Sequence, residues 1–146
     1  TVSIVESFNP LIEMNSVFNN ELSLGLRFNR TRSVNLNISS VQIVEAKDND
    51  MVVGLGYSIS KDLNIRLDVS HKITRALIRK IETGFTQATD GIQTTSVRFA
   101  ADRAMSKSMT LRVYFDKIIN KPLVSSGSYA TADTSAGISL RFNLNP

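Results

Sequence analysis

His71 is the only histidine in the chain, and Asp68 and Ser70 stand close to it in the sequence. These three residue types form the catalytic triad of many hydrolases, in which the imidazole takes a proton from the serine hydroxyl. Successive side chains of a strand point to opposite faces, so Ser70 and His71 cannot converge on one substrate if they lie in a strand. No second histidine could take over the role. We therefore expect His71 to be a solvated histidine at the end of a strand, and we expect no enzymatic activity.

Composition argues against metal and nucleic-acid chemistry. The chain has no cysteine, 17 lysine and arginine residues and a formal net charge of +4. Structural zinc sites need cysteine or clustered histidine, so we expect no metal ion and no cofactor. The basic residues stand singly along the sequence and form no block of the kind that binds nucleic acid. Nucleic acid is therefore not an expected partner.

The elements that position these residues are predicted from a two-residue alternation of apolar and polar side chains. It is clearest in residues 132–145, where Ala136, Ile138 and Leu140 would share one face of a strand. Further strands are predicted at residues 11–18, 21–29, 33–44, 51–60, 63–70, 76–86, 93–102 and 109–117. Residues 76–86 also fit a short amphipathic helix, but Gly84 and two threonines weaken a helix and the neighbouring segments are strands, so a strand is predicted there. Turns or links are expected at residues 19–20, 30–32, 47–50, 61–62, 72–75, 89–91 and 106–108. A bulge or a bend is expected at residues 39–40, where the apolar positions change phase, and a long connection at residues 120–131. Residues 1–9 receive no assignment, and Pro10 is expected to end them.

The predicted fold class is all-β, an antiparallel up-and-down meander of about nine strands, because links this short join antiparallel neighbours. The apolar face of such a sheet could be buried inside a soluble sandwich or a lipocalin-like barrel. It could also face lipid on the outside of a transmembrane β-barrel, with the polar face toward the lumen. The sequence contains no run of about 18 apolar residues, which excludes a transmembrane helix.

The charged residues favour the membrane barrel. Mid-strand arginines are followed two or four residues later, on the same face, by Asp68, Asp102 or Asp116, which suits a water-filled lumen with compensated charge. An ordinary solvated sheet face would show the same pattern, with exposed ion pairs of less than about 1 kcal/mol each. The residues expected to line a channel are Arg27, Arg66, Asp68, Arg98, Arg112, Asp116 and Arg141. The residues expected to face lipid are Leu24, Leu26, Leu55, Leu67, Phe99, Leu111, Val113, Ile138, Leu140 and Phe142.

The final predicted strand also carries a short motif. Its residues are Ser135, Gly137, Leu140 and Phe142. The spacing of a polar residue, a glycine, a hydrophobic residue and an aromatic residue resembles the C-terminal signal with which outer-membrane barrels of Gram-negative bacteria are inserted. The resemblance implies that this strand is a barrel-insertion signal.

Longer blocks of the sequence resemble the C-terminal end of the Sov/SprA family. The blocks are FNPLIEMN at 8–15, the strand at 24–32, VQIVEAKDNDMVVGLGYSIS at 41–60, LNIRLDVS at 63–70, ALIRKI at 76–81, SVRFAADRAMSKSMTLRVYFDK at 96–117 and AGISLRFNL at 136–144. The resemblance implies a location in the bacterial outer membrane. It also implies a function, as a wall segment of the type IX secretion translocon, a channel that exports folded proteins from the periplasm to the cell surface.

The family barrel has about 36 strands. The resemblance therefore implies that residues 1–146 are the C-terminal segment of an incomplete barrel. The partners it implies are the remainder of the translocon barrel in the same or a separate chain, a PorV-type barrel protein, a periplasmic plug protein, secreted cargo proteins and the lipid bilayer. The alternative is a self-contained small outer-membrane β-barrel that acts as an anchor, an adhesin or a porin-like channel.

Overall fold

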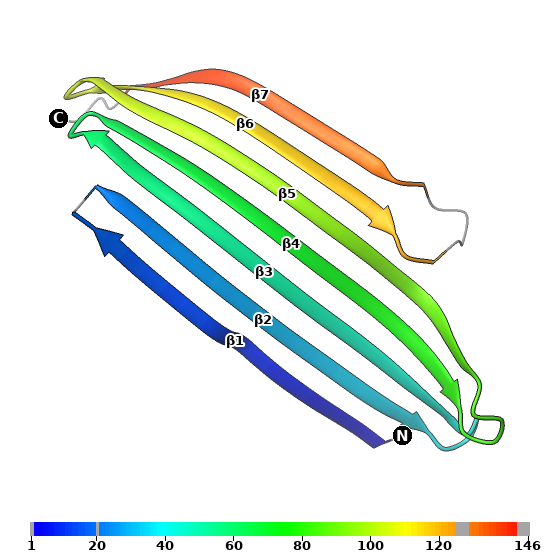
Figure 1. Cartoon of the computed structure of the whole chain (residues 1–146). Helices are drawn as coiled ribbons and strands as arrows, with labels where there is room; N and C mark the ends of the chain where they lie inside the picture. The colour runs from blue at the N-terminus through cyan, green and yellow to red at the C-terminus, as the bar shows by residue number, and fades with distance from the viewer. Residues whose placement is uncertain (1, 20, 125–128, 143–146) are drawn as a thin grey trace.

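Seven long antiparallel strands form one sheet (Figure 1). The computed structural model describes residues 2–19, 21–124 and 129–142. The strands are β1 (Val2–Phe18), β2 (Leu22–Asn37), β3 (Gln42–Ser60), β4 (Leu63–Lys80), β5 (Thr86–Ser106), β6 (Met109–Pro122) and β7 (Thr131–Phe142). Each strand pairs with its neighbours in the sequence, in the order β1-β2-β3-β4-β5-β6-β7. The expected all-β, up-and-down arrangement is confirmed.

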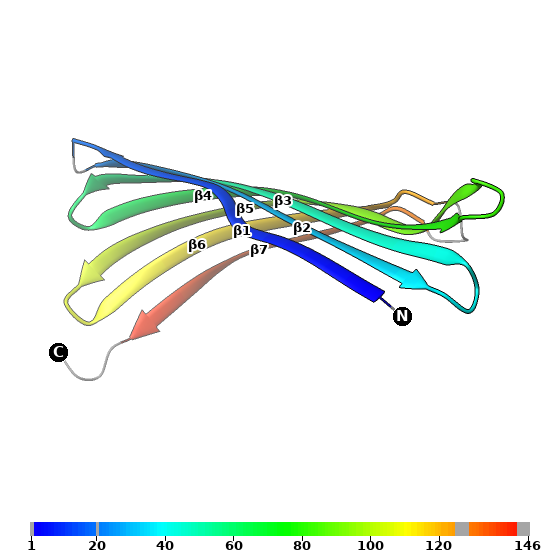
Figure 2. The ribbon, with the colours of Figure 1, turned by 90° about the horizontal axis from the view of Figure 1, so that it is seen from below.

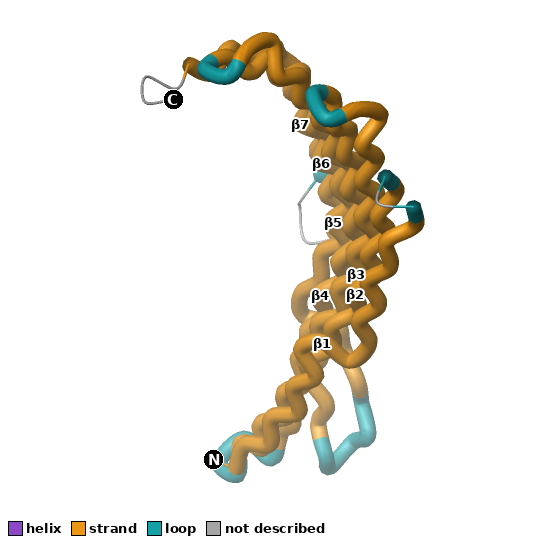
Figure 3. The backbone as a smooth tube through the Cα atoms, turned by 90° about the vertical axis from the view of Figure 1, so that its left-hand side faces the viewer, coloured by secondary structure: helices purple, strands orange, loops and turns teal. Residues whose placement is uncertain are grey.

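The sheet is a single curved layer. Figure 3 shows it as an open arc, and Figure 2 shows the twist of its strands. Among the described residues no apolar side chain is buried, and the one buried side chain is that of Ser96, with 9% of its surface exposed. The second layer of a soluble sandwich is therefore missing from the part of the chain that the structure describes. No helix in the same residues is long and apolar enough to cross a membrane.

The alternation of the sequence separates two surfaces, because directly paired residues of antiparallel strands point to the same side. We call a series of directly paired residues across neighbouring strands a row. On one side of the sheet, the apolar face, one row across β2 to β6 contains Leu24, Leu55, Leu67, Phe99 and Phe115. On the opposite side, the polar face, the adjacent row contains Gly25, Gly54, Asp68, Arg98 and Asp116. One face is thus apolar and the other polar at the same level of the sheet.

The expected number of nine strands is wrong, because four polar stretches lie inside strands. Residues 30–32, 47–50, 72–75 and 89–91 belong to β2, β3, β4 and β5. Pairing continues through three of these stretches, with Arg32 opposite Lys47 and Lys47 opposite Arg75. Polar side chains occupy both faces there, so the alternation fades although the backbone stays extended and paired.

The first strand begins earlier than the sequence predicts. β1 includes residues 2–9, which receive no assignment from their pattern. Pro10 does not end the strand: the register shifts between Phe8 and Ile12, and pairing with β2 continues on both sides of the shift. β1 lies at the edge of this sheet, where a residue without a backbone N–H is tolerated.

Residues 39–40, where a bulge or a bend within one strand is expected, lie instead in a turn between β2 and β3. The side-chain Oδ1 of Asn37 accepts hydrogen bonds from the backbone N–H groups of Ser39 and Ser40, at 3.1 and 3.4 Å. Val41 follows with a φ of 48°. The chain therefore reverses here, which explains why the apolar positions change phase in the sequence.

The connections differ in length between the two ends of the sheet. At the end where β7 finishes, they are short: residues 19–21, 61–62 and 107–108. At the other end they are residues 38–41, 81–85 and 123–130. The expected turn at 61–62 is confirmed, and the turn expected at 106–108 is found at 107–108, because Ser106 ends β5. The long connection expected at 120–131 is found between Pro122 and Thr131. Asn20, residues 125–128 and residues 143–146, with Leu144 of the predicted final strand, lie outside the described residues.

The strand expected at residues 76–86 is divided. Residues 76–80 complete β4, and residues 81–85 connect β4 to β5. Gly84 has a φ of 64°, a conformation that glycine adopts without steric cost. A single apolar pattern across these residues therefore concealed a reversal of the chain.

Candidate functional site

All ten residues predicted to face lipid lie on the apolar face. They are Leu24 and Leu26 of β2, Leu55 of β3, Leu67 of β4, Phe99 of β5, Leu111 and Val113 of β6, and Ile138, Leu140 and Phe142 of β7. In β7 the side chains of Ile138, Leu140 and Phe142 are 72%, 55% and 63% exposed. We call these ten residues, with Ile12, Met14, Phe28, Met51, Tyr57 and Phe115, the apolar band. It crosses all seven strands on the side of the short connections.

All seven residues predicted to line a channel lie on the polar face. They are Arg27, Arg66, Asp68, Arg98, Arg112, Asp116 and Arg141. Arg66 Nε donates a hydrogen bond of 2.7 Å to Asp68 on its own strand. Arg112 donates two hydrogen bonds, of 2.6 and 2.9 Å, to Asp102 on the neighbouring strand β5. Charge on this face is therefore compensated both along and across strands.

The centre of the polar face is a row of alternating charge. Arg98 lies in register between Asp68 on β4 and Asp116 on β6. Opposite charges in direct cross-strand positions stabilise a sheet. These three residues, with Arg66 and Tyr114, line an open hollow of about 470 Å³. The hollow is open and lined by charged side chains, which suits contact with water, ions or a polar polymer.

The terminal motif is divided between the two faces. Ser135 and Gly137 lie on the polar face, while Leu140 and Phe142 lie on the apolar face. Gly137 is directly opposite Tyr114, and a Cβ atom at position 137 would lie 2.6 Å from the Tyr114 hydroxyl oxygen. The glycine therefore provides space for an aromatic side chain of the next strand. Sequence reasoning missed Tyr114 because the pairing of β6 with β7 is not visible in a single segment.

The position expected for His71 is wrong, because the residue lies in the middle of β4 and is half-buried. Its Nδ1 lies 3.0 Å from Thr95 Oγ1 on the apolar face. Ser70 lies on the polar face, where its hydroxyl is 2.6 Å from that of Ser96. The opposite orientation of Ser70 and His71 is confirmed. These two residues therefore do not form part of one catalytic group.

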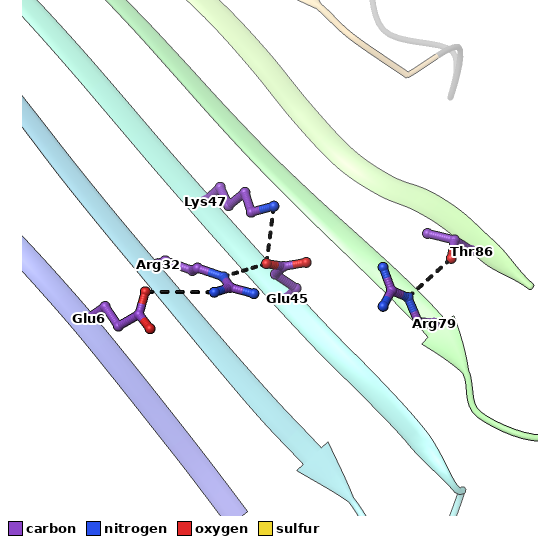
Figure 4. Close-up of polar contacts among 6 residues, drawn as sticks. All are labelled: Glu6, Arg32, Glu45, Lys47, Arg79 and Thr86. Carbon is purple, nitrogen blue, oxygen red and sulfur yellow. Dashed lines mark hydrogen bonds and ion pairs between the residues drawn. The ribbon is translucent and has the colours of Figure 1, made fainter. Parts of the chain in front are cut away.

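A charged belt crosses the apolar face beyond the apolar band, on the side of the longer connections. Its residues are Glu6, Arg30, Arg32, Glu45, Lys47, Arg75, Arg79 and Lys121. Arg32 Nε lies 2.6 Å from Glu45 Oε1, and Lys47 Nζ lies 3.1 Å from the same oxygen (Figure 4). Sequence reasoning missed the belt, because Arg30, Arg32, Lys47 and Arg75 fall in the polar stretches that it assigns to turns.

Glu45 is the central acid of the charged belt, and its side chain is 12% exposed. The hydrogen bond from Arg32 holds the pKa of the Glu45 carboxyl below its usual value, and Lys47 acts in the same direction while partial burial opposes it. The same bond raises the pKa of the Arg32 guanidinium. Glu6 adds a longer contact, with its Oε2 3.7 Å from a terminal nitrogen of Arg32.

Within the described residues, no group of three or more histidine and acidic side chains could hold a metal ion. No protein-family model and no curated protein sequence matches the chain. The candidate site is therefore defined by its surfaces: an exposed apolar band, a polar face with compensated charge, and a charged belt beside the band.

Proposed function

We propose that the sheet is a wall segment of a bacterial outer-membrane channel, with the apolar band against lipid and the polar face toward a water-filled lumen. One observation carries the proposal: the apolar face extends across all seven strands with its side chains exposed or half-buried, and none of its described side chains is buried. A continuous apolar surface of this extent is unfavourable in water and marks contact with lipid or another protein. A polar face at the same level is the arrangement of a transmembrane β-barrel wall.

The lengths of the connections support an orientation. Outer-membrane barrels keep short turns on the periplasmic side and longer loops on the cell surface. Residues 61–62 and 107–108 then lie at the periplasmic side, together with the end of β7. The charged belt lies toward the cell surface.

The open arc supports a larger assembly than this chain. β1 and β7 form the edges of the sheet, and each has a neighbour on one side only. Unpaired backbone N–H and C=O groups are not tolerated in the hydrocarbon region of a membrane. Strands from the remainder of the barrel, in the same or a separate chain, would satisfy both edges.

The resemblance to the Sov/SprA family implies that the channel transports proteins. The channel would conduct folded proteins from the periplasm to the cell surface as part of the type IX secretion translocon. A PorV-type barrel protein and a periplasmic plug protein would be further partners. In this function the polar face provides a hydrated surface for passing proteins and catalyses no reaction.

Adjacent aromatic residues on β6 provide a test of the proposal. Tyr114 lies on the polar face and Phe115 on the apolar face. Each is replaced by a photo-crosslinking phenylalanine analogue in cells that export proteins by this route. We expect secreted cargo to crosslink to position 114 and lipid or nothing to position 115. Absence of cargo crosslinks from position 114, or equal crosslinking from both positions, would contradict the channel function.

A further inference from the structure

We propose that the charged belt binds the phosphate groups of a lipid headgroup at the membrane surface. Three cationic side chains, Arg32, Lys47 and Arg75, lie directly opposite one another in a single row across β2, β3 and β4. Neighbouring strands are about 4.8 Å apart, so the row holds three positive charges within about 10 Å. The proposal rests on the proposed function, because the belt meets a headgroup only if the apolar band lies in lipid.

The row is unfavourable without an anion. Like charges in direct cross-strand positions destabilise a sheet. Glu45 contacts Arg32 and Lys47 from the next row, but in the described part of the chain no ion pair includes Arg75. A phosphate group above Lys47 and Arg75 would remove this repulsion, and the guanidinium of Arg75 can bind two phosphate oxygens at once.

The excess of positive charge is confined to the face that would meet lipid. The belt contains six cationic and two acidic side chains. At the same level on the polar face, charge is compensated, and Lys72 Nζ lies 3.1 Å from Asp48. A general requirement for solubility would affect both faces equally. The difference between the faces points to an anionic partner beside the apolar band.

The surroundings of the row favour a lipid over free phosphate. Arg32 and Arg79 flank a hollow of about 110 Å³ whose lining includes Val34, Ile43 and Leu77. Figure 4 shows Arg32 and Arg79 on either side of Glu45. Apolar side chains between cations suit a headgroup that carries phosphates and hydrocarbon together. Inorganic phosphate offers no apolar part to fill the hollow.

The test uses the assembled protein in phosphatidylcholine nanodiscs that contain lipid A as a minor component. The amount of lipid A retained per protein is measured by mass spectrometry, relative to empty discs. The test variant is Lys47→Gln with Arg75→Gln. The control is Lys80→Gln, which removes a cation from β4 on the polar face. A second arm replaces lipid A with its dephosphorylated form, and a third adds inorganic phosphate as a competitor.

We expect wild type and Lys80→Gln to enrich lipid A, and the double variant to lose about fivefold or more of that enrichment, because each cation near a headgroup adds to its attraction. Dephosphorylated lipid should not be enriched, and inorganic phosphate should not displace lipid A. Equal enrichment in the double variant, enrichment of dephosphorylated lipid, or displacement by inorganic phosphate would overturn this inference alone. Failure of wild type to enter the discs would overturn the proposed function as well.

Discussion

Tyr114 lies over the backbone of Gly137, directly across the pair of strands β6 and β7. A Cβ atom at position 137 would lie 2.6 Å from the hydroxyl oxygen of Tyr114 and 3.0 Å from its Cε1. An aromatic ring over a glycine of the neighbouring strand fills space and helps to fix register. This contact therefore links the terminal motif to the position of the edge strand.

Replacement of Gly137 by valine should weaken the edge strand. The new side chain would overlap the ring of Tyr114, and overpacking of this kind costs about 1–3 kcal/mol. We expect less β7 to be protected from protease in membranes of cells that make the protein. Ala136→Val is the matched control, because Ala136 lies on the exposed apolar face. Equal protection in both variants would show that the contact is unimportant.

A new arginine should reduce assembly of the protein on one face of β2 and be tolerated on the other. Leu24 lies in the central row of the apolar band, where an arginine would cost about 2–4 kcal/mol if the band spans the membrane. Ser23 is its neighbour on the polar face, beside an open hollow of about 280 Å³ that can accept the side chain. We expect Leu24→Arg to reduce the amount of assembled protein and Ser23→Arg to leave it nearly unchanged. Similar losses in both variants would argue against lipid on the apolar face.

The fold could be predicted from the sequence wherever one face of a strand is apolar. β7 and the first half of β4 show this, because their side chains alternate without interruption. The continuation of β3 through Lys47 and Asp48 could not be predicted, because one is on each face and both are charged. Such a stretch shows no two-residue alternation of apolar and polar side chains. It stays extended because β2 and β4 pair with it on either side.

The ion pair of Arg112 and Asp102 should form again when the acid and the arginine exchange positions. Asp102→Arg alone places two cations in direct opposition across β5 and β6, and we expect it to lower the yield of assembled protein. The double variant Asp102→Arg with Arg112→Asp restores opposite charges at the same distance. Its yield should return toward that of wild type. A double variant no better than Asp102→Arg would mean that the pair has no structural role.

Acid should reduce the stability that Glu45 contributes to the charged belt. The pKa of Glu45 is lowered in the folded protein, chiefly by the hydrogen bond from Arg32. Its contribution to stability is therefore complete above the usual glutamate pKa, about 4.3, and is lost as the pH falls through the lowered value. We expect amide hydrogen-exchange protection factors of residues 43–47 to decrease below about pH 4. Glu45→Gln should already have reduced protection at neutral pH and should lose this part of the pH dependence.

The candidate site could be predicted only in part. The face of each residue follows from the two-residue period, which explains why Leu140 and Arg141 are on the expected sides. Contacts between strands, such as Tyr114 with Gly137 or Arg32 with Lys47, depend on register. Register is set by the turns and by the length of each strand, and the sequence pattern placed four turns where the strands continue.

We expect the apolar face to contact lipid and the polar face to contact water. Residues 1–146 contain no cysteine, so a single introduced cysteine is the one thiol within this segment. Two adjacent pairs are suited to this measurement: Ser23 with Leu24 on β2, and Ser139 with Leu140 on β7. In each pair the serine lies on the polar face and the leucine on the apolar face.

The most direct measurement is the rate at which a charged, membrane-impermeant maleimide labels these four cysteines in native membranes. Labelling in denaturant gives the maximum for each variant. We predict that Ser23→Cys and Ser139→Cys are labelled rapidly, while Leu24→Cys and Leu140→Cys react only after denaturation. Equal rates at all four positions, or faster labelling at positions 24 and 140, would show that the apolar face does not contact lipid.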